Sequence, residues 1–265
     1  MTSPADLLDL ATRIAREAGE LAHRRRREGV TVAATKSAAA DIVTAADREV
    51  EAFIRAELAE ARPGDGFFGE ESGAEEGTSG ITWVVDPIDG TVNYAYGIPA
   101  WAISIAAVEG PAETSAWTAL AGVVFNPVTG EMFRGVRGGG AWLGDERLSV
   151  SEVGEAGGLV ATGFGYDPET HAPALAQLAR VMPVARDVRR IGAASLDLAS
   201  VAAGRIDAYY ERGTHPWDHA AGALLVEEAG GRLGGAPGGR PGNGMVIAAG
   251  PDFFSRLEPL LDYDR

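Results

Sequence analysis

A run of six residues that begins at Asp86 carries groups able to bring a metal ion and a phosphate together. It reads Asp-Pro-Ile-Asp-Gly-Thr and follows a short apolar stretch that is typical of a buried strand. Because Pro87 has no N–H to donate, we expect the strand to end and the chain to turn there. Asp86 and Asp89 could then face one crevice, and Gly90 would let the backbone approach a ligand closely. Thr91 is expected to open a helical turn whose N–H groups suit an anion.

Four further acidic residues could add to this turn. Glu70 and Glu71 lie in a glycine-rich loop, Asp47 follows Thr44 by three positions, and Asp218 opens a helix farther along the chain. Each also has a structural explanation. Thr44 and Asp47 form a pattern typical of a capping box, an acid at a helix start is favoured by the dipole, and loop acids are often solvated. Taken together, however, these residues could supply one acidic pocket.

Carboxylates crowded into one pocket repel one another, and without cations their pKa values rise until some are neutral. The chain has no cysteine, so any metal must be held by oxygen or imidazole. Oxygen ligands indicate Mg²⁺, with Mn²⁺ as a possible substitute. His215 and His219 flank Asp218, but four scattered histidines are too few for a convincing zinc site. Two magnesium ions could activate water and stabilise the leaving oxygen of a phosphoryl transfer.

Composition narrows the classes of partner. The 265 residues include 38 acidic and 23 basic ones, a net charge of -15, which disfavours a nucleic-acid-binding surface and fits a cytoplasmic protein. No apolar run reaches the roughly 20 residues of a membrane helix, and Asp6 and Asp9 interrupt any signal-like segment. The basic run that begins at Arg24 could contact nucleic acid or a membrane. We favour a solvated helix end, where basic residues suit the dipole.

The elements that must position these residues follow from hydrophobic periodicity and turn signals. Ser3 and Pro4 are typical of a helix start, and a second helix is expected at about 44–60. Strands are expected at 81–85, 102–108, 120–125 and 131–136, the last two forming a hairpin. Farther on, strands are expected at 159–162, 187–190, 206–210 and 245–248, and helices at 171–181, 194–203, 218–229 and 253–261.

The balance of strands and helices predicts an α+β fold of layers with two β-sheets. We expect a strand-rich N-terminal half at about 1–150 and an alternating α/β half at about 151–265. The segment 230–244 holds eight glycines and two prolines, so it is expected to be a surface loop.

Three segments resemble the signature segments of the inositol monophosphatase family. They are Gly-Glu-Glu-Ser at 69–72, Asp-Pro-Ile-Asp-Gly-Thr-Val-Asn-Tyr at 86–94, and Trp-Asp-His-Ala-Ala-Gly at 217–222. Further similarity lies at 41–47, 122–125 and 206–211, so the resemblance covers nearly the whole chain. It implies a single domain over 1–265, an αβαβα sandwich that is usually dimeric. It also implies magnesium-dependent, lithium-sensitive hydrolysis of a small phosphate monoester.

The resemblance also implies a set of metal ligands. Glu70, Asp86 and the backbone carbonyl of Ile88 would hold one Mg²⁺ ion. Asp86, Asp89 and Asp218 would hold a second, and a third, weaker ion near Glu70 is implied as well. The chain matches the family pattern at each of these five positions.

Catalytic and substrate contacts are implied in the same way. Thr91, hydrogen-bonded to Asp47, would orient the attacking water near Glu70 and help to deprotonate it. The backbone amides of Gly90 and Thr91 would cradle the phosphate. The implied substrate contacts are Asp89, Gly90, Thr91, Ala194 and Glu211.

The identity of the substrate stays open at this stage. Inositol 1-phosphate is the preferred interpretation, but Glu211 would suit the ammonium group of histidinol phosphate as well as polyol hydroxyls. Fructose 1,6-bisphosphate is a further alternative.

Arg190 could position substrate or form a structural ion pair. Tyr94 and His219 depart from the commonest family pattern without touching an expected ligand. Some relatives also bind the transcription machinery, so a regulatory protein-binding module is the alternative of another class.

Overall fold

The computed structural model describes residues 3–29, 32–35, 42–110 and 116–262, and Asp41 falls outside this part of the chain. The helices are α1 (Pro4–Glu28), α2 (Ala45–Ala61), α3 (Thr91–Tyr96), α4 (Pro168–Val181), α5 (Ala194–Ala202), α6 (Pro216–Glu228) and α7 (Pro251–Leu257), with a 3-10 turn η1 (Glu258–Leu260). The first helix starts as expected, because the Ser3 side chain accepts the N–H of Asp6. Strand β2 ends at Thr44, whose side chain lies outside the description, so the expected capping box stays a prediction.

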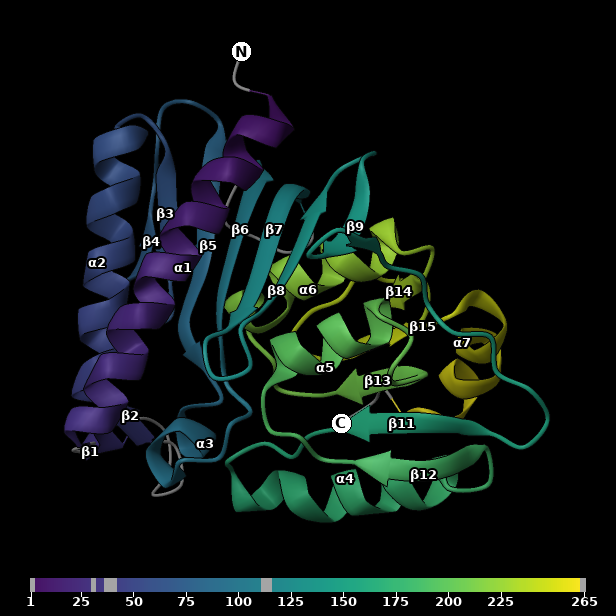
Figure 1. Cartoon of the computed structure of the whole chain (residues 1–265). Helices are drawn as coiled ribbons and strands as arrows, with labels where there is room; N and C mark the ends of the chain where they lie inside the picture. Colours follow the sequence, from purple (N-terminus) through teal and green to yellow (C-terminus); the bar gives the residue numbers. More distant parts are fainter. Residues whose placement is uncertain (1–2, 30–31, 36–41, 111–115, 263–265) are drawn as a thin grey trace.

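The helices and sheets form the expected αβαβα layers. Helices α1 and α2 cover one face of the larger sheet, α5 and α6 lie between the two sheets, and α4 and α7 lie beyond the smaller sheet (Figure 1). The larger sheet has the order β10-β9-β8-β7-β6-β5-β3-β4, the smaller β12-β11-β13-β15-β14, and β1 pairs with β2 in a separate ribbon.

The strands are β1 (Val32–Thr35), β2 (Ile42–Thr44), β3 (Gly66–Gly69), β4 (Gly73–Glu75), β5 (Ile81–Asp89), β6 (Ala102–Glu109), β7 (Thr118–Asn126), β8 (Glu131–Val136), β9 (Gly140–Leu143), β10 (Glu146–Arg147), β11 (Gly158–Thr162), β12 (Ala185–Arg189), β13 (Ala208–Glu211), β14 (Arg232–Gly234) and β15 (Val246–Ala249). Every strand expected from the sequence is present, with ends shifted by a few residues, and β7 and β8 form the expected antiparallel hairpin.

Two expectations about loops were wrong. The glycine-rich segment around Glu70 contains β3 before this residue and β4 after it, and the segment 230–244 contains the edge strand β14. Both segments are rich in glycine, which conceals the alternating pattern that normally identifies a strand. Their pairing with β5 and β15 supplies the hydrogen bonds that composition alone does not predict.

The expectation that Pro87 ends its strand was also wrong. Strand β5 continues through Pro87 to Asp89, because its pairing with β6 shifts by one residue between Asp86 and Asp89. The pairing with β3 already stops at Val85. Pro87 therefore lies in a β-bulge on a stretch that needs no regular N–H donor, which is where proline is tolerated in a sheet.

A buried tyrosine anchors α3 to α1. The Tyr94 side chain is fully buried, packs edge-on against Trp101 at 5.0 Å between ring centroids, and donates its hydroxyl to the carbonyl of Ala22 at 2.9 Å. Asn93 beside it donates to the carbonyls of Ala100 and Ile191, which joins the two halves of the chain. The tyrosine that departs from the commonest family pattern thus has a structural role.

Replacement of Tyr94 by phenylalanine is expected to lower the free energy of unfolding by about 0.5–1.5 kcal/mol, because one buried hydrogen bond is lost while the ring is kept. Urea denaturation measures this value. Tyr96→Phe is the matched control, since Tyr96 is 78% exposed and its hydroxyl should contribute little. Equal effects of the two substitutions would contradict the assigned role of Tyr94.

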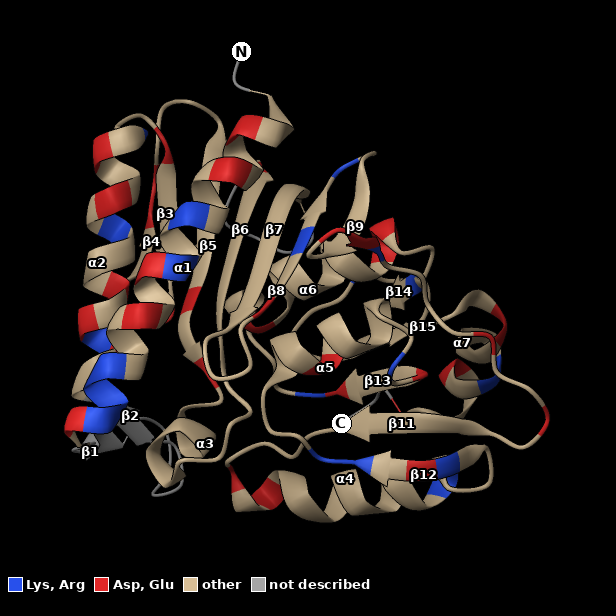
Figure 2. Cartoon of the chain, viewed as in Figure 1, with Lys and Arg blue, Asp and Glu red and all other residues tan. Residues whose placement is uncertain are grey.

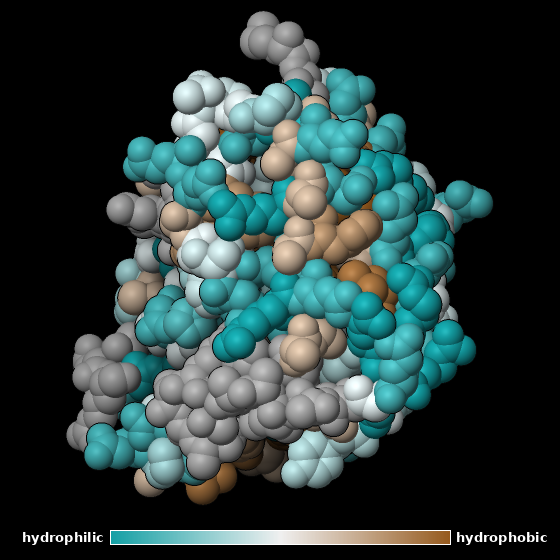
Figure 3. Space-filling model, turned by 90° about the vertical axis from the view of Figure 1, so that its left-hand side faces the viewer, coloured by the Kyte–Doolittle hydropathy of each residue, from teal (hydrophilic) through white to brown (hydrophobic). Residues whose placement is uncertain are grey.

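The surface beside α2 is predominantly polar. Acidic and basic residues alternate along α1 and α2, and the basic run ends α1 beside the start of α2 (Figure 2). Arg25 in this run pairs with Glu28 and Glu49, each at 2.6 Å. Outside its grey atoms, Figure 3 shows only small separate apolar patches on this face. These contacts favour the solvated helix end over a nucleic-acid or membrane patch. Within the described residues, no helix has the length and apolar character required to cross a membrane.

Candidate functional site

Parallel pairing of β3 with β5 brings the first two acidic residues together. Gly69 is paired with Val85, so the next residues, Glu70 and Asp86, leave the same edge of the sheet side by side. The Glu70 N–H donates to the carbonyl of Val85 at 3.2 Å. Burial, and then the nearby Glu70 side chain, raise the pKa of Asp86 above its usual value.

The bulge in β5 adds the third carboxylate. Asp86 pairs with Ser104 and Asp89 with Ala102, and these two partners are two residues apart on β6. In a regular strand, side chains three positions apart point to opposite faces. The extra residue in the bulge reverses this, so that Asp86 and Asp89 line the same cavity. The Asp86 side chain accepts the N–H of Ile88 at 3.0 Å, which fixes the bulge locally.

The C-terminal half supplies the opposite wall. Glu211 ends β13, and Asp218 lies in the first turn of α6, where its side chain accepts the N–H of His215 at 2.6 Å. Together with the β5 residues they line an acidic cavity of about 500 Å³. We call it the acidic cavity. The expected residues that line it are Glu70, Asp86, Ile88, Asp89, Gly90, Thr91, Ala194, Glu211 and Asp218.

Burial and mutual repulsion shift the pKa values of the carboxyl groups in the acidic cavity. Burial, followed by the charges of Glu70, Asp89 and Asp218, raises the pKa of Asp86 well above its usual value. Burial and the neighbouring Asp89 charge likewise raise the pKa of Asp218 well above its usual value. The pKa of Asp89 is raised too, because burial outweighs the hydrogen bonds from Ser195. The cluster therefore needs either protons or cations to balance its charge.

The groups in the acidic cavity that could bind a metal ion are of the kind that a hard cation prefers. All are oxygens, and three of the carboxyl groups have raised pKa values because they are buried and crowded together, a charge imbalance that a hard cation would relieve. Within the described residues, no three acidic or histidine side chains are already arranged as ligands for one ion. The reason is visible in their contacts, because Asp86 bonds to Ile88, Asp89 to Ser195 and Asp218 to His215.

Thr91 and Asp47 form the pair expected from the sequence. Asp47 is 1% exposed on α2, beneath the cavity, and its Oδ1 lies 3.1 Å from the Thr91 hydroxyl. The same hydroxyl lies 3.1 Å from the carbonyl of Ile88, so it can donate to either oxygen. A donating hydroxyl keeps its lone pairs free to accept a proton from water in the cavity. Gly90 precedes it with φ +90°, and a Cβ there would lie 3.0 Å from the Ala100 carbonyl oxygen.

Two residues that hold the acids in place were not expected. Ser195, fully buried at the start of α5, donates its N–H to Asp89 at 2.7 Å and its hydroxyl at 2.5 Å. Glu51, 3% exposed on α2, accepts the N–H of Glu71 at 2.7 Å. Glu51 follows Asp47 by one helical turn, and this spacing is the signal that could have identified it. No comparable signal marks Ser195.

Glu211 projects between the two halves of the molecule. Its carboxylate accepts the Tyr209 hydroxyl at 2.8 Å and packs so closely on Gly163 that a Cβ there would clash with the carboxyl group. Burial raises the pKa of Glu211 to about 7, although the Tyr209 hydrogen bond and the Arg190 charge oppose this shift. Ala194 and Arg190 line the same cavity. The structure thus brings the expected substrate contacts together.

The two histidines near Asp218 have different environments. His215 lines the acidic cavity and stacks on Trp217 at 4.9 Å, whereas His219 is buried elsewhere, beside Trp117. Burial lowers the pKa of His219 to about 4. Because the two side chains lie in different cavities, the structure gives no support to a shared zinc site.

The layered fold with its acidic cavity is that of a phosphatase of the αβαβα class. The chain belongs to the inositol monophosphatase family, whose sequence model matches residues 3–256. A Mycobacterium tuberculosis protein named inositol-1-monophosphatase SuhB is 41% identical over 98% of both chains. The crystal structure of extragenic suppressor protein suhB from Bartonella henselae superposes with a TM-score of 0.87 at 36% identity, covering 98% of this chain and 99% of that one. A Pasteurella multocida protein named Nus factor SuhB is 37% identical and covers 96% of this chain and 97% of its own.

Proposed function

We propose that the protein hydrolyses a small phosphate monoester in the presence of Mg²⁺, with inositol 1-phosphate as its substrate. The observation that carries this proposal is the buried cluster of Asp86, Asp89 and Asp218, whose raised pKa values indicate that a cation is needed. Membership of the inositol monophosphatase family supports the phosphatase class, and we infer the substrate from the residues that line the acidic cavity.

We assign two Mg²⁺ ions to the oxygens of this cluster, with a third, weaker ion near Glu70 and with Mn²⁺ as a substitute. Glu70, Asp86 and the Ile88 carbonyl would hold one ion, and Asp86, Asp89 and Asp218 would hold the other. When bound, the ions would lower the pKa of water and neutralise charge on the phosphate. The repulsion among the carboxylates, which burial intensifies, is relieved by the same positive charge.

The chain's own groups would then orient and deprotonate the nucleophile. Thr91 accepts a proton from the water while donating its own to Asp47, which is buried and close enough to receive that hydrogen bond. The N–H groups of Gly90 and Thr91 cradle the phosphate oxygens at the start of α3. Asp89, held by Ser195, keeps its position beside the substrate.

Glu211 and Ala194 support a polyol as the alcohol part of the substrate. A carboxylate can accept hydrogen bonds from two neighbouring hydroxyls, and a small alanine side chain leaves room for a ring. Among the described residues, six carboxylates and only two guanidinium groups, those of Arg190 and Arg212, line the acidic cavity, which disfavours a second phosphate such as that of fructose 1,6-bisphosphate. Histidinol phosphate, with its ammonium group, is the closer alternative.

The test is phosphate release from inositol 1-phosphate, histidinol phosphate and fructose 1,6-bisphosphate, each with and without Mg²⁺. The parent protein, Asp89→Asn and the control Asp187→Asn are compared, since Asp187 is an exposed acid outside the cavity. We expect the highest kcat/KM for inositol 1-phosphate, strict dependence on Mg²⁺ and loss of activity only in Asp89→Asn. A preference for histidinol phosphate would overturn the substrate, and no release from any ester would overturn the enzyme.

The contact between Glu51 and Glu71 predicts an effect on magnesium affinity. Glu51→Ala removes the acceptor that holds the segment beside Glu70, so we expect the Mg²⁺ concentration for half-maximal activity to rise about 10-fold or more. Glu51→Gln is the matched control, because its side-chain oxygen can still accept the Glu71 N–H. Magnesium titrations of kcat measure both variants. A similar rise for both would show that the charge of Glu51, rather than the hydrogen bond, matters.

Further properties are proposed on the basis of family membership. We propose that the chain acts as one domain, because α5 and α6 pack in one core with residues of both halves. We also propose a cytoplasmic homodimer that lithium inhibits. It has no nucleic-acid or membrane partner in this proposal.

A regulatory role is the second candidate, because a relative carries the name Nus factor SuhB. A protein that acted only by binding a partner would retain that binding without Mg²⁺ and in Asp89→Asn. Size-exclusion chromatography of both forms with the candidate partner, alongside the activity assay, distinguishes the two functions.

A further inference from the structure

A second cavity adjoins the acidic cavity and shares part of its wall. It has a volume of about 610 Å³ and lies between the N-terminal part of α4, the end of β13 and the loop before β15. We call it the side cavity. The residues that line both cavities are Gly165, Asp167, Thr170, Glu211, Arg212 and Gly213. A molecule that contacts Glu211 in the acidic cavity can therefore extend into the side cavity.

The side cavity is not needed for a small ester. The acidic cavity, at about 500 Å³, already lies within the roughly 300–1,000 Å³ that small-molecule sites occupy. A monocyclic polyol phosphate would be contained in it. The additional 610 Å³ thus provides space for a part of the substrate beyond the first ring.

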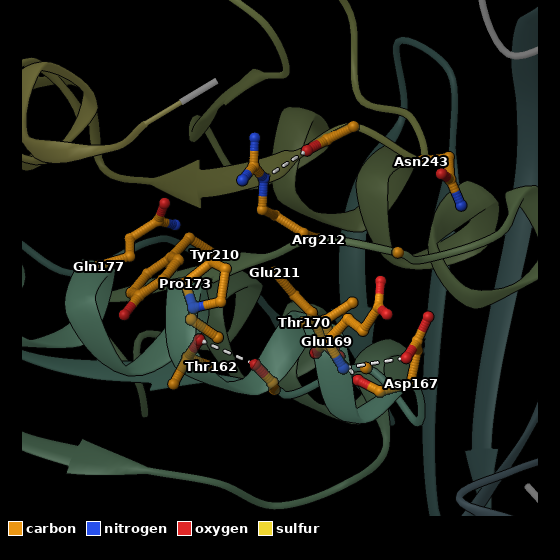
Figure 4. A pocket seen from close by; sticks show the side chains of 15 residues that line it. Thr162, Asp167, Glu169, Thr170, Pro173, Gln177, Tyr210, Glu211, Arg212 and Asn243 are labelled. Carbon is orange, nitrogen blue, oxygen red and sulfur yellow. Dashed lines mark hydrogen bonds between the residues drawn. The ribbon is translucent and has the colours of Figure 1, made fainter. Parts of the chain in front are cut away.

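The lining of the side cavity presents polar groups to a ligand. The Tyr210 side chain is 3% exposed, and its hydroxyl lacks a hydrogen bond of good geometry within the described residues, although Thr162 is close to it. Gln177 lies nearby and accepts the Asp262 N–H through its side-chain oxygen, which leaves its amino group as the donor. Figure 4 shows Tyr210 and Gln177 at one end of the cavity and Asp167 toward the other. A ligand with hydroxyl groups could satisfy Tyr210.

The charges in the side cavity disfavour a second anion. Asp167, Glu169 and Glu211 line it, and Arg212 is the one basic residue among the described residues that do so. The Nε of Arg212 already donates to the carbonyl of Gly244 at 3.2 Å. Such a surface complements neutral hydroxyls or an ammonium group and repels phosphate.

We propose that the side cavity holds a second ring on the alcohol part of the substrate, and that this ring carries hydroxyl or amino groups and no phosphate. The inference rests on the proposed phosphatase function and narrows it to phosphate monoesters of a glycosylated polyol. Glu211 contacts the first ring at the junction of the two cavities, and Tyr210 and Gln177 contact the second.

The test compares three esters on the full chain with Mg²⁺. They are inositol 1-phosphate, inositol 1-phosphate that carries a hexosamine on a ring hydroxyl, and inositol 1,4-bisphosphate. We expect kcat/KM for the hexosamine ester to exceed that for inositol 1-phosphate by about tenfold or more, and the bisphosphate to be the poorest. Equal or lower kcat/KM for the hexosamine ester would overturn the proposal while leaving the phosphatase function intact. Hydrolysis of none of the three would overturn the proposed function itself.

Substitutions that block the side cavity give an independent test of the proposal. Ala174 lines it, whereas the neighbouring Leu175 is 57% exposed and lines neither cavity, so Ala174→Trp and Leu175→Trp form a matched pair. We expect Ala174→Trp to remove the advantage of the hexosamine ester and to leave hydrolysis of inositol 1-phosphate unchanged, which also shows that the variant is folded. Tyr210→Phe should lower only kcat/KM for the hexosamine ester. An equal loss for both esters, or none, in Ala174→Trp would overturn the proposal.

Discussion

Replacement of Thr91 by valine is expected to lower kcat for phosphate release by about 10²–10⁴-fold, the usual contribution of a positioned proton acceptor. Valine keeps the shape of threonine but has no hydroxyl to accept a proton from water or to donate to Asp47. The hydroxyl is 3.1 Å from Asp47, and Asp47 is 1% exposed, so no bulk water can take over this contact. Because the variant keeps the backbone N–H of residue 91, KM should change little.

Thr91→Ser is the control that separates chemistry from packing. Serine keeps the hydroxyl and loses a methyl group, so its kcat should stay within about tenfold of the parent. Initial-rate measurements at saturating Mg²⁺, with the thermal midpoint of each variant as a folding check, compare the two. A loss in Thr91→Ser as large as that in Thr91→Val would show that the methyl group, and not the proton transfer, explains the effect.

Magnesium should stabilise the protein far more at about pH 8 than at about pH 5.5. The folded protein raises the pKa of Asp86, Asp89 and Asp218 above the usual value of an aspartate, so these acids hold protons that the unfolded chain has already released. Their contribution to the stability of the metal-free protein is thus lost as the pH rises from the unfolded to the folded pKa. Mg²⁺ favours the charged form, and its stabilisation grows over the same window.

The expected size of the stabilisation by Mg²⁺ follows from mass action. Magnesium at about 100 times its Kd adds about 2.7 kcal/mol, which corresponds to roughly 5–10 °C in Tm for a chain of this length. Thermal denaturation with and without Mg²⁺ at the two pH values measures it. Asp86→Asn should be more stable than the parent without Mg²⁺ at the higher pH, because Asn still accepts the Ile88 N–H and adds no charge. A magnesium effect that is independent of pH, or unchanged in Asp86→Asn, would contradict this account.

Much of the architecture could be predicted because apolar periodicity reports burial directly. In the helices and most strands, apolar residues recur with a clear helical or strand period. The layered arrangement can be predicted because these apolar faces must pack against one another. The strands rich in glycine were missed, since β3 and β14 depend on the partners that pair with them. The end of β5 was misplaced because Pro87 does break a regular ladder. Only the shift in pairing with β6, a property of two distant segments, permits the strand to continue.

The acidic cavity could be predicted because its residues lie in short, compact motifs. Glu70, Asp86 and Asp218 are recognisable by type and by their place at strand ends and helix starts. The supporting contacts were less accessible. Ser195 reaches Asp89 across 106 positions of sequence, and a buried serine on a helix has no distinctive pattern. Long-range contacts of this kind depend on the start of α5 lying beside the end of β5, and they cannot be inferred from either segment alone.

The bulge in β5 limits how the chain could vary. Asp86 and Asp89 lie three positions apart, and they share one cavity because the bulge places an extra residue between them. Loss of a single residue between them would restore regular pairing and leave both carboxylates on one face, but it would remove the turn in which Asp86 accepts the N–H of Ile88. Substitutions can adjust this stretch gradually, but the loss of one residue removes the bulge and its turn in one step. Members of the family that keep the chemistry should therefore differ here in residue type and never in residue count.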